Sequence, residues 1–98
     1  MRRAARTDGN HKSIVAALER AGWEIVDLSR VGQGVPDLLA VRASHAVLIE
    51  IKDGAKSASR RQLTDQQRAF HTRMALAGWA VWVVTSDTDE RIWGINAG

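Results

Sequence analysis

Three charged residues near the middle of the sequence have the types and the spacing that metal-assisted chemistry on phosphate esters requires. Glu50 and Lys52 lie two residues apart in an apolar segment, and Asp37 begins the apolar segment before it. Residues i and i+2 of a strand share one face, so Glu50 and Lys52 are expected to project together. If the two segments pair, Asp37 comes near them.

The chemistry that such a group supports is hydrolysis with a divalent cation. Carboxylate oxygens suit Mg²⁺, which takes octahedral oxygen ligands and completes its shell with water or phosphate. A bound ion polarises a phosphate and acidifies a bound water, and a neighbouring ammonium stabilises developing charge. Asp37 and Glu50 are therefore candidate ligands of Mg²⁺ or Mn²⁺, and Lys52 is a candidate catalytic residue. By itself, the Glu50–Lys52 pair is equally consistent with a surface salt bridge.

The hydrophobic pattern before these residues predicts a helix followed by three strands. Apolar residues recur at helical spacing over residues 10–21, and Gly22 stands where a helix C-cap belongs. Residues 23–28, 37–42 and 46–52 are predicted strands. The last two are separated only by residues 43–45, so we expect an antiparallel hairpin.

The pattern after these residues predicts a second helix and a further strand. Thr64 and Gln67 have the spacing of a capping box, and the helix is expected to end near Gly78. Its expected buried stripe consists of Phe70, Met74 and Ala77. Residues 79–85 are predicted to form a central strand covered on both faces, and residues 92–95 an edge strand or a tail. The expected fold is α/β, with a mixed sheet and the element order αβββαβ.

Length and charge favour a single basic domain that binds a polyanion. The chain has 98 residues, a net charge of +3 and a pI near 10.2, and basic side chains displace counterions from phosphates. We expect a basic arm over residues 1–8, a flexible basic loop over 53–62 and a tail over 87–98. The candidate DNA-binding residues are Arg2, Arg3, Arg6, Lys12, Lys56, Arg60 and Arg61. The alternative is that these charges are only solvated ends and loops.

Cysteine and hydropathy exclude several classes of protein. The chain contains no cysteine, so disulfide stapling, thiolate zinc sites and thiol nucleophiles are excluded. This composition fits a reducing cytosol. No apolar run approaches the length of a membrane span, so we expect no membrane association.

Three ordered motifs resemble a known nuclease family. They are Gly34-Val35-Pro36-Asp37-Leu38-Leu39, Ile49-Glu50-Ile51-Lys52-Asp53-Gly54 and Leu63-Thr64-Asp65-Gln66-Gln67. Pro36-Asp37 and Glu50-Ile51-Lys52 resemble the signature of the PD-(D/E)XK superfamily, whose restriction-endonuclease-like core also has the order αβββαβ. More narrowly, the chain resembles the stand-alone, phage-type VRR-NUC nucleases over roughly residues 8–86.

The resemblance implies a role for each matching residue. Asp37, Glu50 and the backbone carbonyl of Ile51 would bind the metal, and Lys52 would assist the attack of water. Gln67 would face the site, although a purely capping role is equally consistent with its position. Asn10 and His11 are candidate site residues on the inward face of the first helix, where many relatives carry a metal-binding glutamate, and their presence there argues against a second metal site.

The implied activity is that of a Mg²⁺- or Mn²⁺-dependent DNA endonuclease selective for branched DNA such as Holliday junctions. The resemblance further implies a homodimer in the cytoplasm of a bacterium or phage-infected cell. One alternative is a flap, nick or nonspecific nuclease, and another is a catalytically degenerate nucleic-acid-binding module. A small α/β domain with an incidental ion pair is the simplest alternative.

Other features of the sequence have less specific interpretations. The four tryptophans are able to stack on bases, but core packing is the more common role, and we expect it for Trp82. The triplet Ala-Gly-Trp occurs at residues 21–23 and 77–79, each time between a helix and a strand. Residues 32–34 are expected to form a turn. His11, His45 and His71 lack the spacing of a zinc site, so surface or core roles are expected.

Overall fold

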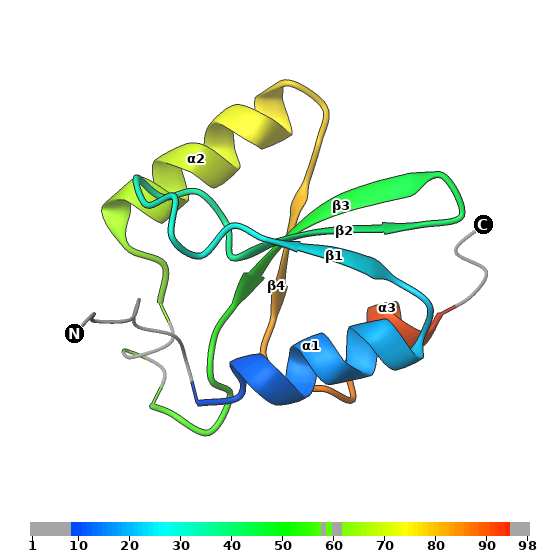
Figure 1. Ribbon diagram of the computed structural model, residues 1–98. Helices are drawn as coiled ribbons and strands as arrows, with labels where there is room; N and C mark the ends of the chain where they lie inside the picture. Colours follow the sequence, from blue (N-terminus) through cyan, green and yellow to red (C-terminus); the bar gives the residue numbers. More distant parts are fainter. Residues whose placement is uncertain (1–8, 58, 60–61, 95–98) are drawn as a thin grey trace.

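The computed structural model describes residues 9–57, 59 and 62–94, and shows a mixed four-stranded sheet with helices on both faces (Figure 1). Its elements are α1 (His11–Arg20), β1 (Glu24–Asp27), β2 (Leu38–Arg42), β3 (His45–Ile51), α2 (Asp65–Leu76), β4 (Val81–Val84) and α3 (Glu90–Trp93). The predicted α/β class and the order αβββαβ are confirmed, with α3 added at the end. Across the described ranges, no helix is long and apolar enough to span a membrane.

The strand order is β1-β2-β3-β4, with antiparallel pairing except between β3 and β4, which are parallel. A parallel pair requires a crossover, and α2 supplies it. The predicted central position of the last strand is therefore wrong, because β4 lies at the sheet edge. The guanidinium of Arg91 donates a hydrogen bond of 2.7 Å to the carbonyl of Val83, which satisfies a group on the outer side of β4.

The hairpin between β2 and β3 is tighter than expected. Arg42 pairs with His45, which leaves only Ala43 and Ser44 in the turn. Their φ values are 51° and 71°, and two-residue hairpins of the type I′ class require positive φ at both positions. His45 is consequently the first residue of β3 and not part of the turn.

The hydrophobic core lies between the sheet and α1 with α3. Fully or nearly fully buried residues form it: Ile14, Ala17, Leu18, Trp23, Leu38, Ala40, Val47, Ile49, Ile51, Val84 and Ile92. The indole N–H of Trp23 donates to the carbonyl of Ile92 at 3.0 Å. Residues 90–93 therefore form a short helix that completes the core, where the sequence predicted an edge strand or a tail. Residues 95–98 lie outside the described residues.

On the opposite face of the sheet lies α2, the one helix of the described residues on that side (Figure 1). No residue of α2 is buried, so the predicted buried stripe is wrong. Phe70 and Met74 are half-buried and Ala77 is exposed, because α2 packs against the β4 side of the sheet and no other helix within residues 9–57, 59 and 62–94 covers the rest. Val26 and Val41 consequently remain exposed on this face.

The loop between β1 and β2 packs tightly against the start of α2. Gly32, Gln33 and Gly34 all have positive φ, which confirms the predicted turn. A Cβ atom added at Gly34 would lie 2.4 Å from the carbonyl oxygen of Gln66. The close approach fixes the loop three residues before Asp37 against the first turn of α2.

We expect Gly34→Ala to destabilise the protein more than Gly32→Ala. Both residues have positive φ, which costs a residue with a Cβ about 1–2 kcal/mol, but nothing lies within 4 Å of a Cβ at Gly32. The clash with Gln66 should cost a further 1–3 kcal/mol, roughly the penalty for overpacking. Urea denaturation of both variants measures the difference, and equal losses would contradict the close packing at Gly34.

Candidate active site

Asp37 lies directly before β2 and contacts the backbone of β3. Its Oδ2 accepts a hydrogen bond of 2.8 Å from the N–H of Ile51. In an extended strand the N–H and C=O of one residue point to the same side, so the Ile51 carbonyl also faces the β2 side. Asp37 thus contacts Ile51, the residue between Glu50 and Lys52 in the sequence, as the predicted strand pairing requires.

Glu50 is the only charged residue in the buried part of the described chain, with 2% of its surface exposed. Its Oε2 accepts a hydrogen bond of 3.1 Å from Nε2 of Gln67. Its Oε1 lies 3.8 Å from Nε2 of His71. Burial of a carboxylate is costly unless polar groups surround it, and α2 supplies these groups.

Lys52 extends from the end of β3 toward the same helix. Its Nζ donates a hydrogen bond of 2.9 Å to Oε1 of Gln67, and its side chain is half-buried. The backbone N–H of Lys52 donates to the Val84 carbonyl at 3.0 Å, which continues the parallel pairing with β4. The prediction that Glu50 and Lys52 project from one face is confirmed, because both reach the amide of Gln67.

Gln67 links the helix cap to the charged residues. Its Oε1 accepts from the N–H of Thr64 at 2.9 Å, and its own N–H donates to Oγ1 of Thr64 at 3.1 Å, which completes a capping box. The same Oε1 accepts from Lys52, and Nε2 donates to Glu50. The capping role and the site-facing role, left as alternatives by the sequence, therefore belong to one side chain.

Asn10 joins the start of α1 to the ends of β3 and β4. Its Nδ2 donates to the carbonyl of Lys52 at 3.1 Å and to that of Thr85 at 2.8 Å. Asn10 is therefore adjacent to the site through the backbone of Lys52. Its side chain makes no capping hydrogen bond to α1.

His11 contributes to a different cluster, near the end of β1. The pKa of Asp27 is lowered mainly by hydrogen bonds from Ser29, and to a smaller extent by the charges of His11 and Arg30. The charge of His11 thus acts on Asp27, whereas Asn10 contacts the backbone of Lys52.

His71 is the site residue that sequence reasoning missed. Surface or core packing was expected for it, yet its Nε2 faces the carboxylate of Glu50. Burial lowers the pKa of His71, and the positive charge of Lys52 lowers it further, so the imidazole is neutral near pH 7. The available signal was spacing: His71 lies four residues after Gln67, and side chains four apart share a helix face.

The predicted DNA-binding residues are only partly within the described chain. Lys12 is exposed in the first turn of α1, and Lys56 is exposed in a turn after β3. The other five, Arg2, Arg3, Arg6, Arg60 and Arg61, lie outside the described residues.

The donor set fits a hard divalent cation bound through an incomplete protein shell. In residues 9–57, 59 and 62–94, no group of three or more His, Asp or Glu side chains is arranged to hold a metal ion. Asp37 keeps one carboxylate oxygen, Oδ1, without a hydrogen bond in this part of the chain. The carboxylates of Asp37 and Glu50 and the carbonyl of Ile51 are oxygen donors of the kind that Mg²⁺ or Mn²⁺ binds, with water completing the shell.

No protein-family model matches the sequence, and no curated protein matches it significantly.

The lowered pKa of His71 predicts a loss of stability in acid. The unfolded chain binds a proton near pH 6.5 and the folded chain only at lower pH, so stability falls as pH decreases from about 6.5 toward the folded pKa. His71→Gln should reduce this slope in metal-free urea denaturation between pH 8 and 5.5. His45→Gln, which removes an exposed imidazole, is the control. An unchanged slope in His71→Gln would contradict the assignment.

Proposed function

We propose that this chain is a metal-dependent DNA endonuclease of the VRR-NUC type within the PD-(D/E)XK superfamily. The observation that carries the proposal is the single amide of Gln67, which binds both Glu50 and Lys52 while Asp37 contacts the residue between them. An incidental ion pair would be exposed and would gain little from such support. Glu50 is instead buried, and two side chains of α2, Gln67 and His71, approach its carboxylate.

Each residue has a distinct role in the proposed hydrolysis of a phosphodiester bond by water. Asp37 and Glu50, with the Ile51 carbonyl, hold the metal. When bound, Mg²⁺ or Mn²⁺ would polarise the scissile phosphate and acidify a bound water. Lys52 orients the attacking water and stabilises the negative charge that develops on the phosphate. Gln67 positions Lys52 and Glu50 relative to each other, so that neither side chain must be reorganised during the reaction.

The basic character of the chain supports DNA as the substrate. A net charge of +3 favours a polyanion. Two exposed lysines follow site residues closely in the sequence: Lys12 comes shortly after Asn10, and Lys56 shortly after Lys52. We propose that these lysines and the arginines outside the described residues bind the phosphate backbone. The proposed setting is the cytoplasm of a bacterium or of a phage-infected cell.

Lys52→Ala and Asp37→Asn are expected to reduce metal-dependent cleavage by at least about a hundredfold, the typical effect of removing one preorganised charge-stabilising group. The assay is cleavage of labelled DNA with Mg²⁺, Mn²⁺ or EDTA. Arg30→Ala, which removes an exposed charge from the β1–β2 loop, should cleave like the wild type. Undiminished turnover by purified Lys52→Ala would refute the assigned role.

A second outcome of the same assay supports a different function. Asn10 stands where a glutamate would bind metal in many VRR-NUC relatives, and its amide is engaged with two carbonyls. Salt-sensitive DNA binding without any metal-dependent product would identify the chain as a nucleic-acid-binding module that has lost catalysis.

We further propose selectivity for branched DNA and action as a homodimer. One copy has one site, and two copies related by a twofold axis present two sites to the two strands of a junction. At matched salt, a four-way junction should be cleaved faster than a flap or linear duplex. Sedimentation equilibrium should give twice the monomer mass. Equal rates on all three substrates would favour a nonspecific nuclease, and a catalytically active monomer would exclude the homodimer.

A further inference from the structure

The repeated Ala-Gly-Trp triplet forms the same backbone structure at two helix ends but places the two indoles differently. Gly22 and Gly78 have φ values of 94° and 92°. The N–H groups of Trp23 and Trp79 each donate to the carbonyl five residues earlier, at 3.0 and 2.8 Å. Trp23 is 4% exposed and belongs to the core, whereas Trp79 is 44% exposed. The backbone N–H of Trp79 is therefore bonded in the same way as that of the core residue Trp23, while the ring of Trp79 is partly exposed.

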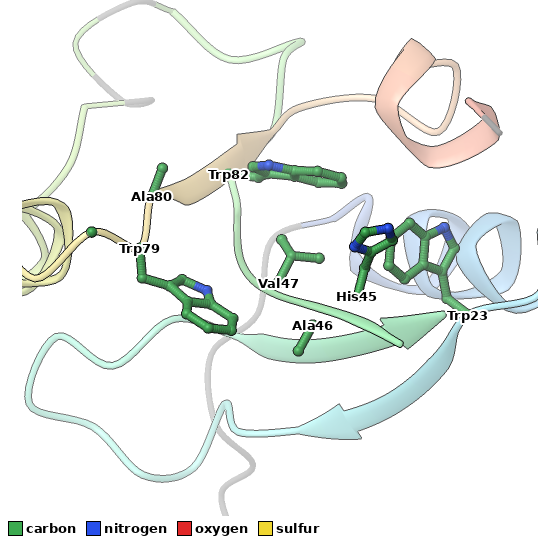
Figure 2. Close-up of a pocket in the computed structure, with 8 residues that line it drawn as sticks. Trp23, His45, Ala46, Val47, Trp79, Ala80 and Trp82 are labelled. Atoms are coloured by element: carbon green, nitrogen blue, oxygen red, sulfur yellow. The ribbon is translucent and has the colours of Figure 1, made fainter. Parts of the chain in front are cut away.

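Trp79 borders an aromatic cavity near the turn end of the β2–β3 hairpin, where β3 begins. The cavity has a volume of about 460 Å³ and is lined by Trp23, His45, Ala46, Val47, Gly78, Trp79, Ala80 and Trp82. In Figure 2 the ring of Trp82 lies above Val47 and the ring of Trp79 to its lower left, and both residues line the cavity. Its volume is within the range of small-molecule sites.

The chemistry of the lining favours a flat, aromatic, electron-rich group. None of the lining residues is acidic. Within the described chain, the indole N–H groups of Trp79 and Trp82 donate no hydrogen bond, in contrast to that of Trp23. Guanidinium groups of Arg42 and Arg91 lie over the rings of Trp23 and Trp82, at 4.3 and 5.2 Å. The charge of Arg91 is balanced by Asp89. The exposed ring of Trp79, the indole N–H donors and the positive charge of Arg42 together match a nucleobase attached to a phosphate chain.

We propose that this cavity binds an unpaired base of the DNA substrate, stacked on Trp79. The proposal rests on the proposed nuclease function, which supplies DNA as the ligand. Ala46, at the cavity, and Glu50, at the catalytic site, lie on the same face of β3. Four residues of strand span about 13 Å, or about four nucleotides at 3.4 Å per step. A strand with its phosphate at Glu50 can therefore place a base about four nucleotides away in the cavity.

The test separates recognition of the base from recognition of the backbone. Binding to a labelled single-stranded oligonucleotide is measured in EDTA, beside an oligonucleotide of equal length with abasic sites in its central part. Trp79→Ala should weaken binding of the intact strand by at least about fivefold, the lower end of the contribution of one stacked base. Binding of the abasic strand should not change. Trp93→Ala is the matched control, because Trp93 is 42% exposed and lies outside the cavity.

A second measurement avoids truncation of the side chain. DNA should quench the tryptophan emission of the wild type, and the quenching should be weaker in Trp79→Phe, which retains a stacking ring. Thermal unfolding of each variant identifies any loss of fold.

Three results would overturn the proposal. The first is that a folded Trp79→Ala binds the intact strand with unchanged affinity and that DNA quenches Trp79→Phe as strongly as the wild type. The second is that Trp79→Ala loses the same affinity for the intact strand as for the abasic strand. The third is dissociation of a dimer by Trp79→Ala with no change in base preference, which would assign the cavity to a second copy. Failure of the nuclease function is distinguishable, since base-dependent binding in EDTA would then persist without metal-dependent cleavage.

Discussion

The burial of the Glu50 carboxylate is the constraint on which the arrangement of this protein depends. A charged group excluded from water must be surrounded by polar groups, and β3 cannot provide them from its own apolar residues. Gln67 and His71 come to Glu50 from α2. Polar contacts at the first two turns of α2, including the contact between Gln67 and Lys52, thus join the half-buried Phe70 and Met74 in holding α2 on the sheet.

This mode of docking explains the contrast between the two faces of the sheet. The α1 face is a conventional apolar core, in which α1 and α3 bury their residues against β2, β3 and β4. The α2 face has no fully buried helix residue and leaves apolar side chains accessible toward the hairpin end. A small domain has little apolar surface to bury. In this protein most of the buried apolar surface lies on the α1 face. The α2 face instead carries the polar contacts of Glu50 and the exposed side chain of Trp79.

Several parts of the candidate site follow from local rules. The alternation of a strand predicts that Glu50 and Lys52 face one way, and the Thr64–Gln67 spacing predicts the capping box. The two-residue turn and the short α3 could not be predicted from such local rules. A turn of type I′ usually contains Asn or Gly, whereas Ala43 and Ser44 adopt it here. The helix at residues 90–93 is too short to show periodicity.

The sequence by itself determined the order of helices and strands, the antiparallel hairpin and the common face of the acidic and basic residues. These depend on neighbours within a few positions, because periodicity and capping act along the chain. Only the tertiary structure decided that β4 is an edge strand, that His71 contacts Glu50 and that Trp79 is exposed where Trp23 is buried. These outcomes depend on contacts between residues far apart in sequence, such as Trp23 with Ile92, and no local pattern specifies which distant surface a side chain will meet.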